Sequence, residues 1–77
     1  MTEQEWREEF AFKLRRVYKN RGYDQKRFAE ALGVSEMTIS NYRKCKRTPD
    51  AYMLTAMSEV LECDIRELIP NGEPIIK

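Results

Sequence analysis

The sequence predicts an all-α domain of five helices joined by short connections, and three observations support this fold class. Apolar residues recur at the three- and four-residue spacing of one helix face. Residues that favour helix starts, Asp or Ser, stand directly before four of the expected helices. Only three glycines and three prolines occur among the 77 residues, and no apolar run approaches the roughly 18 residues that a membrane span needs.

The first helix is expected over residues 2–20. Its apolar residues share one face and would pack on the rest of the domain: Trp6, Phe10, Leu14 and Val17. Arg21 and Gly22 follow this face, and glycine is the usual residue at a helix end. We therefore interpret Trp6 as a core residue and expect the first helix to end before Gly22.

The second and third helices, expected over residues 25–32 and 36–44, form a pair within the stretch DQKRFAEALGVSEMTISNYR. Ala29 lies midway along the first of them, where a small side chain lets the next helix approach closely. Gly33 falls where that helix must end, and glycine takes the left-handed conformation without steric cost. The pair is therefore expected to cross steeply, with a tight turn between its members.

Each helix of this pair begins with a cap. Asp24 and Ser35 are good N-caps, and the residue before each can form a hydrophobic staple, in the pairs Tyr23 with Phe28 and Val34 with Ile39. Ile39 and Tyr42, three residues apart, would turn one face of the third helix to the core. Four side chains are left for the opposite face: Glu36, Met37, Ser40 and Asn41.

Two more helices are expected towards the end of the chain. Asp50 would cap a fourth helix that continues to about residue 62. Asp64, followed three residues later by Glu67, resembles a capping box for a short fifth helix, with Cys63 and Leu68 as its staple. These elements place all five helices within a single folded domain.

The folded domain is expected over residues 1–69, and the tail 70–77 is interpreted as either a dimer contact or a disordered end. A chain of this length has a small core, so dimerisation or well-capped helices must supplement it. The C-terminal region carries more apolar residues than such a core could bury, which predicts a contact between two copies: Ile65, Leu68, Ile69, Ile75 and Ile76.

The net charge of +1 hides an uneven distribution. Residues 1–9 carry a net −3, and residues 48–77 carry a net −4. Between them, residues 10–47 carry eleven Lys or Arg against three acids, a net +8, and such a basic region attracts a phosphate backbone. Some of its cations fit a solvated helix surface equally well: Lys13, Arg15, Arg16 and Lys19. Others favour phosphate contact: Arg43, Lys44, Lys46 and Arg47.

The cysteine and histidine content argues against catalysis and metal binding. Cys45 and Cys63 lack the close spacing of a zinc site, and the chain has no histidine. Without a histidine base or an activated nucleophile, we expect no enzymatic activity, no cofactor and no small-molecule ligand. The start MTEQEWREE is unlike a secretory signal, which predicts a cytoplasmic protein that does not bind membranes.

Residues 24–43 resemble the DNA-reading helix-turn-helix of the phage repressor and Cro-like (Xre-type) family, through Ala29, Gly33 and Ile39. The likeness covers about residues 10–69 and includes the following turn and helices: Lys46, Arg47, Pro49, Leu54, Met57, Leu61 and residues 64–69. It implies a compact lambda-repressor-like domain whose second and third helices form the helix-turn-helix. It also implies sequence-specific binding of double-stranded DNA by a transcriptional regulator, most simply a dimeric repressor on a near-palindromic operator.

In this interpretation the third helix lies in the major groove and its outward side chains read base edges. Asn41 would bond an adenine, Met37 would contact a thymine methyl, Glu36 would accept from a cytosine amino group, and Ser40 would serve a base or a phosphate. The remaining contacts would go to phosphates, with the role of Gln25 implied by the resemblance: Gln25, Ser35, Thr38, Arg43, Lys44, Lys46 and Arg47.

Other interpretations remain open at this stage. Met37 also fits a gap-filling core position, and Gln25 and Ser35 also fit helix starts. Cys45 stands where the family often has glycine or asparagine, which predicts a strained or differently shaped turn. The same fold also serves as a protein-interaction module, such as an antitoxin or a phage accessory factor. Three anions near the reading surface fit that alternative: Asp24, Glu30 and Glu36.

Overall fold

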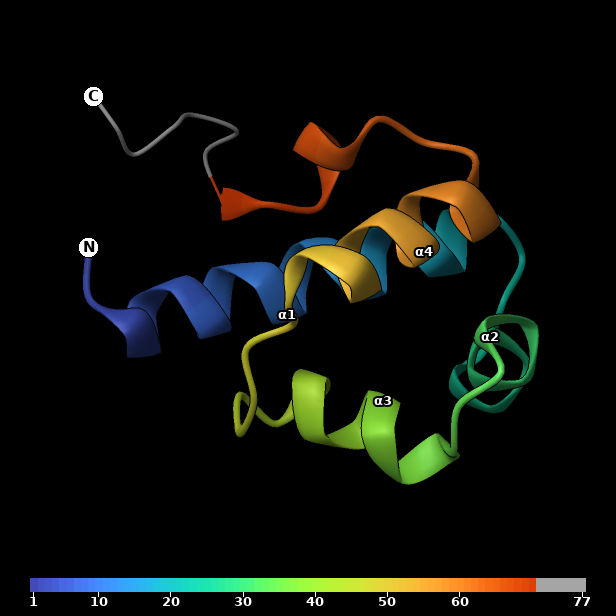
Figure 1. The fold of residues 1–77 in the computed structure, drawn as a ribbon, viewed down its shortest axis with the longest axis horizontal. Helices are drawn as coiled ribbons and strands as arrows, with labels where there is room; N and C mark the ends of the chain where they lie inside the picture. The colour runs from blue at the N-terminus through green and yellow to red at the C-terminus, as the bar shows by residue number, and fades with distance from the viewer. Residues whose placement is uncertain (71–77) are drawn as a thin grey trace.

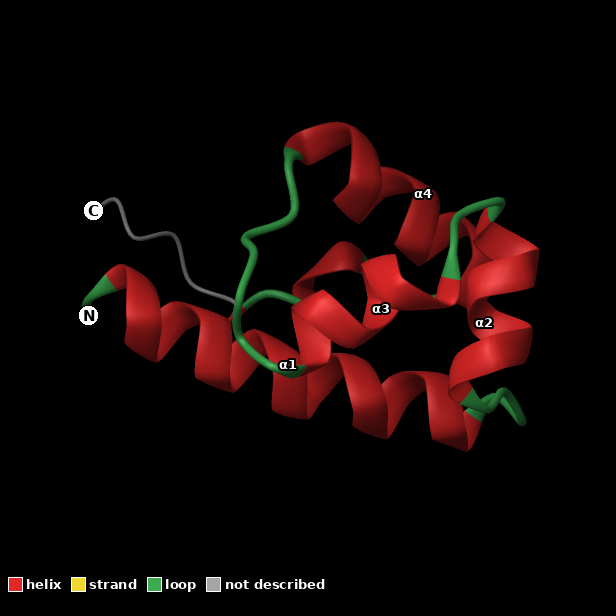
Figure 2. Ribbon diagram, turned by 90° about the horizontal axis from the view of Figure 1, so that it is seen from below, coloured by secondary structure: helices red, strands yellow, loops and turns green. Residues whose placement is uncertain are grey.

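In the computed structural model, which describes residues 1–70, the chain is all-helical and no strand occurs in that range. Four α-helices are followed by one 3-10 turn (Figure 1): α1 (Glu3–Asn20), α2 (Gln25–Leu32), α3 (Glu36–Arg43), α4 (Ala51–Leu61) and η1 (Ile65–Glu67). α3 packs against both α1 and α2, and α2 also packs against α4. Figure 2 shows α3 between α1 and α4, with α2 closing one end.

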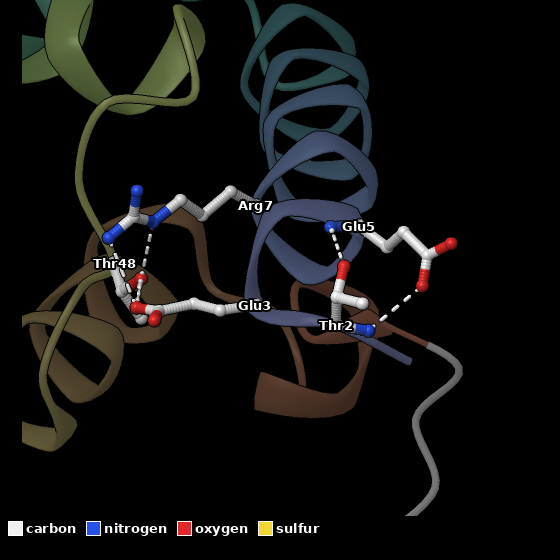
Figure 3. A network of polar contacts seen from close by, with 5 residues as sticks. All are labelled: Thr2, Glu3, Glu5, Arg7 and Thr48. Atoms are coloured by element: carbon white, nitrogen blue, oxygen red, sulfur yellow. Dashed lines mark hydrogen bonds and ion pairs between the residues drawn. The ribbon is translucent and has the colours of Figure 1, made fainter.

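Local hydrogen bonds set the ends of α1. The hydroxyl of Thr2 accepts from the Glu5 N–H at 3.1 Å, and the Glu5 carboxylate accepts from the Thr2 N–H at 2.8 Å (Figure 3). This reciprocal pair is a capping box. Gly22 follows the helix with a φ of 86°, in the left-handed region that glycine adopts freely. The predicted end at Arg21 and Gly22 is therefore confirmed.

The core consists of eleven buried apolar residues contributed by every helix and by the segment after η1: Phe10, Leu14, Val17, Tyr18, Phe28, Ala29, Ile39, Tyr42, Met57, Leu61 and Leu68. Aromatic rings join the helices, since the Tyr18 and Phe28 centroids lie 5.1 Å apart and those of Phe10 and Tyr42 lie 6.1 Å apart. Trp6, predicted as core, is half-buried and stacks on Phe10 at 5.3 Å. This single core fixes the position of α3 against α1.

The prediction of a fifth helix is wrong. The segment after α4 forms only the 3-10 turn Ile65–Glu67, and the expected capping box is absent because the Asp64 carboxylate accepts from the Arg66 N–H at 2.9 Å. The Glu67 N–H bonds the Asp64 carbonyl instead, at 2.8 Å. With Leu68 buried in the core and Pro70 also buried, the chain must turn inward before another helical turn can form.

Of the predicted tail 70–77, only Pro70 is among the described residues. The predictions for Ile75 and Ile76 therefore lie outside the part of the chain that the structure describes. Within that part, no helix is both long enough and apolar enough to cross a membrane. Burial raises the pKa of the Cys63 thiol, and the nearby Glu67 carboxylate adds to this effect. Cys63 packs against the core, as predicted.

Candidate nucleic-acid interface

A tight turn joins α2 to α3 and fixes their relative orientation. Gly33 has a φ of 78°, and its N–H donates to the Glu30 carbonyl at 3.1 Å. The Val34 N–H donates to the Ala29 carbonyl at 3.0 Å, which completes the pattern of a Schellman motif. Ala29 itself is buried where α2 meets the core. The helix-ending role predicted for Gly33 is thus confirmed, and the burial of Ala29 agrees with the predicted need for a small side chain there.

The N-terminal ends of both helices are capped as the sequence predicts. The Asp24 carboxylate accepts from the Arg27 N–H at 2.8 Å, and the Ser35 hydroxyl accepts from the Thr38 N–H at 3.2 Å. A second bond joins the hydroxyls of Ser35 and Thr38 at 3.0 Å. Ser35 remains exposed and Thr38 half-buried, so both hydroxyls also border the outer surface of α3.

The two faces of α3 differ sharply in burial. Ile39 and Tyr42 are buried in the core, and burial raises the pKa of the Tyr42 phenol. On the other side, Met37 is 65% exposed and Glu36 is also exposed. The gap-filling interpretation of Met37 is therefore wrong. The remaining two predicted base-reading residues flank Met37 and are half-buried: Ser40 and Asn41.

A chain of hydrogen bonds links the start of α2 to both ends of α3. The Gln25 amide nitrogen donates to the Glu36 carboxylate at 3.5 Å, and the Arg43 guanidinium donates to the Gln25 amide oxygen at 2.6 Å. Gln25 therefore does more than begin a helix. We call these three side chains the polar ridge. In it, the Gln25 amide binds the Glu36 anion through its nitrogen and the Arg43 cation through its oxygen.

The end of α3 and the turn after it carry four cations, and the turn has an unusual backbone conformation. Cys45 has a φ of 62°, and the bonds around it repeat the Schellman pattern of Gly33: the Cys45 N–H donates to Tyr42 and the Lys46 N–H donates to Asn41. A left-handed conformation at a residue with a side chain is strained, which confirms that prediction for Cys45. The cations around it are all exposed: Arg43, Lys44, Lys46 and Arg47.

The segment behind this turn is fastened to α1 by a network that sequence reasoning missed. The Arg7 guanidinium donates to the Thr48 hydroxyl at 2.8 Å and to the Glu3 carboxylate at 3.0 Å (Figure 3). The Thr48 hydroxyl in turn donates to Glu3 at 2.9 Å. Glu3 and Thr48 lie 45 positions apart in the sequence, so no local pattern could have indicated this contact.

Apart from Arg7, which binds Thr48 and Glu3, the basic residues of α1 fall into two groups. Lys13 is half-buried and its ammonium donates to the Ile69 carbonyl at 2.8 Å, so it fastens the C-terminal segment to α1. The other three are exposed on the outer surface: Arg15, Arg16 and Lys19. Arg21, just after α1, donates to the Glu62 carbonyl at the end of α4. The outer cations of α1 thus lie on the side of the helix away from its buried residues, whereas α3 packs against α1 through the core.

The arrangement offers hydrogen-bonding and cationic groups but no metal-binding cluster. Within residues 1–70, no three His, Cys, Asp or Glu side chains lie close enough together to hold a metal ion. The surface around α3 instead presents hydroxyls, amides, one thioether and the Glu36 carboxylate, with four cations at the C-terminal end of α3. Such groups are suited to the edges of bases and to the oxygens of phosphates.

Two helices joined by a glycine turn, with the second exposing a polar face beside the core, define a helix-turn-helix domain. The model of the helix-turn-helix (HTH_3) family matches residues 14–68, so the chain belongs to this family. The crystal structure of an HTH_3 family transcriptional regulator from Vibrio cholerae is similar, with a TM-score of 0.79 and 21% identity over 87% of the present chain. At that identity, the likeness shows a shared fold.

The length of the two proteins differs considerably. The similar region covers 38% of the Vibrio cholerae chain, so the present chain spans well under half of that protein's length. No curated protein matches the sequence significantly.

Proposed function

We propose that this chain binds double-stranded DNA sequence-specifically and acts as a transcriptional regulator. The observation that supports this most directly is the outer face of α3, where four side chains with base-reading chemistry lie opposite the buried Ile39 and Tyr42: Glu36, Met37, Ser40 and Asn41. A helix of this diameter fits the major groove of B-form DNA, in which each base pair presents a distinct pattern of donors and acceptors. The second helix of a helix-turn-helix docks there.

Within this proposal, Asn41 reads an adenine through its amide, with about 1–3 kcal/mol of discrimination against other bases. Met37 is the exposed large apolar side chain of α3 and contacts a thymine methyl group. Ser40 bonds a base or a phosphate. Glu36 accepts from a cytosine amino group, and its charge near the DNA is offset by the neighbouring Gln25 amide and Arg43 guanidinium.

Phosphate contacts come from both sides of α3. Gln25, at the start of α2, uses the positive end of a helix as well as its own amide. Ser35 and Thr38 contribute hydroxyls at the start of α3. The exposed cations around Cys45 hold the phosphates at the other end: Arg43, Lys44, Lys46 and Arg47. The Arg7–Thr48 bond supports this proposal because it restrains the chain directly after these cations.

The simplest regulatory outcome is repression, in which two copies occupy a near-palindromic operator with their α3 helices about 34 Å apart, one turn of the double helix. The contact between copies was predicted in the C-terminal region. Leu68 has to be removed from that prediction, because it is buried in the core of a single copy. Ile65 and Ile69 are half-buried within the same copy, which leaves them little surface for a partner.

Selection from a random DNA library at moderate salt tests the proposal. Enrichment of a two-fold symmetric motif is the expected result, and it would reveal the operator. A matched selection with Asn41→Ala should retain the motif but lose preference at one base pair in each half. If the unmodified chain retains no DNA above background, the proposal is wrong and the protein-interaction alternative takes its place.

A further inference from the structure

The outer face of α1 carries a charge pattern that DNA binding at α3 does not use. Six exposed side chains lie along it, one or two per turn, and we call them the α1 stripe: Glu5, Glu8, Phe12, Arg15, Arg16 and Lys19. They are on the side of the helix opposite the buried Phe10, Leu14 and Val17. Phe12 lies at the centre of the stripe and is 65% exposed.

Charges in the stripe are separated by sign. The carboxylates all precede Phe12 and the cations all follow it. None of the stripe's charged side chains forms an ion pair with another described residue, since the ion pairs within residues 1–70 join Glu3 to Arg7 and Asp64 to Arg66. Arg16 instead lies over the Phe12 ring, with its guanidinium carbon 5.6 Å from the ring centroid. Within one copy the Glu5 carboxylate accepts from the Thr2 N–H and the Glu8 carboxylate accepts from the Gln4 amide. Both carboxylates therefore have only neutral partners, and the charges of the stripe are not paired with opposite charges.

Four of the five charges in the stripe are spaced symmetrically about Phe12. Glu8 lies four residues before Phe12 and Arg16 lies four residues after it, while Glu5 and Lys19 lie seven residues before and after it. Spacings of four and seven residues return to the same helix face. When two such helices lie side by side and antiparallel, each carboxylate in one meets a cation in the other, and the two Phe12 rings meet at the centre.

We propose that the α1 stripe is an interface between two copies of this chain, in which the α1 helices pair antiparallel around a two-fold axis at Phe12. Glu8 of each copy then faces Arg16 of the other, and Glu5 faces Lys19. The Phe12 rings supply apolar contact between these pairs. A self-complementary surface of this kind is what an isologous two-fold interface requires. The macrodipole of α1 also favours carboxylates near its start and cations near its end. Glu8 and Arg15 lie outside the terminal turns in which this effect acts, so the dipole does not account for their charges.

The position of the stripe is compatible with DNA binding by both copies. In Figure 2, α1 runs along the lower edge of the molecule, whereas α3 lies between it and α4. The stripe is on the side of α1 opposite its buried residues, whereas α3 packs against α1 through the core. Pairing of two α1 stripes therefore leaves the outer face of α3 uncovered in each copy. The inference deepens the proposed two-copy binding, but it does not depend on DNA.

The size of the stripe sets the expected strength of the contact. Residues 5 to 19 of a helix span about 21 Å, at 1.5 Å per residue. One pair of helices over that length buries less than the roughly 800 Å² per partner of a standard stable interface. The association should therefore be weak, concentration-dependent and sensitive to salt.

Sedimentation equilibrium of the full chain, without DNA and in reducing buffer to exclude disulfides, tests the inference. We expect a monomer–dimer equilibrium between about 10 µM and about 1 mM, the range for a contact of this size. Glu8→Arg and Arg16→Glu each oppose like charges across the axis, and each should raise the dissociation constant at least about tenfold, because both copies of the pair are affected. Phe12→Ala should weaken the dimer as well.

The decisive sample is an equal mixture of Glu8→Arg and Arg16→Glu chains. Each variant supplies the charge that the other lacks, so the mixture should associate about as well as the unmodified chain. Glu59→Arg, at an exposed position on α4, is the matched control and should leave the dimer unchanged. Circular dichroism verifies that every variant is folded.

Three results would overturn the inference. The unmodified chain could remain monomeric to about 1 mM, the weak limit of specific contacts. The mixture could associate no better than its two components, or the stripe variants could leave the dissociation constant unchanged, which would place the contact elsewhere. None of these results bears on DNA binding, because DNA is absent, whereas the library selection can fail while the dimer forms.

Discussion

The outer faces of α1 and α3 expose one large apolar side chain each, and to the same extent: Phe12 and Met37 are both 65% exposed. Their surroundings differ. Met37 is flanked by a hydroxyl and an amide on the helix, with cations beyond its end, whereas Phe12 lies between carboxylates on one side and cations on the other. An exposed apolar residue therefore does not identify a partner. The charges around it do, and they favour a polyanion at α3 and a second copy at α1.

The dependence of binding affinity on salt should be the largest difference between the outer faces of α3 and α1. DNA binding through six or more phosphate contacts is expected to weaken about 10³-fold or more between 50 and 200 mM salt, because counterions are released on binding. The α1 contact should weaken only several-fold, because salt screens a few opposed charges there and no condensed counterions are released. Fluorescence anisotropy with operator DNA and sedimentation without DNA measure the two. A flat salt response of DNA binding would contradict the phosphate assignments.

Single substitutions should separate specificity from general affinity. Asn41→Ala is expected to cost about 1–3 kcal/mol at one base pair and to leave self-association unchanged. Lys46→Ala should weaken all sequences alike and lower the salt slope by about one. Binding to a panel of single-base operator variants checks both. If both substitutions reduce affinity uniformly, Asn41 does not read a base. Phe12→Ala is the matched control from the other face and should leave sequence preference intact.

Cys45→Gly should stabilise the fold by about 1 kcal/mol, because it relieves a left-handed backbone at a residue with a side chain. Glu62, at the end of α4, has a φ of 54°, so Glu62→Gly is the matched control and should give a similar gain. Thermal unfolding measures it, at roughly 4–8 °C per kcal/mol for a domain of this size. Gly33→Ala should have the opposite sign. A loss of stability in Cys45→Gly would mean that the thiol makes a contact worth more than the strain.

The smallest expected effect concerns pH and the start of α1. The Thr2 N–H bonds the Glu5 carboxylate and holds the pKa of Glu5 below its ordinary value of 4.5. A lowered pKa in the folded state means that the contribution to stability is complete above pH 4.5 and is lost as the pH falls through the lowered pKa. An NMR titration of the Glu5 side chain measures this. Thr2→Ala should raise the Glu5 pKa by removing the hydroxyl half of the capping box.

Much of the fold follows from residues within three positions of one another. Asp24, Ser35 and Asp50 each cap a helix by accepting a hydrogen bond from the N–H three residues ahead, so the helix starts could be predicted locally. The same reasoning failed at Asp64, whose carboxylate bonds the Arg66 N–H two residues ahead. There Leu68 is buried in the core, and this burial outweighs the local preference for a helix.

The candidate site also has one part that could be predicted from the local sequence and one part that could not. The side chains that α3 presents outward follow from its period, because burial of Ile39 and Tyr42 fixes where Met37 points. The ridge of Glu36, Gln25 and Arg43 does not follow, since its members lie up to 18 positions apart and meet only when α2 crosses α3. The exposure of Met37 likewise needed the packed structure, because methionine fits both a core and a surface.

The sequence alone predicts where α2, α3 and α4 begin, which face of each helix is apolar, and that residues 24–43 form two helices joined by a glycine turn, because these properties depend on caps, period and one glycine within a few residues. The packed structure was needed to show that residues 65–67 form a 3-10 turn, that Lys13 binds the Ile69 carbonyl, and that Arg7 binds Thr48 behind the basic turn. Such contacts join residues 41 or 56 positions apart, and their geometry exists only after the helices have packed around the common core.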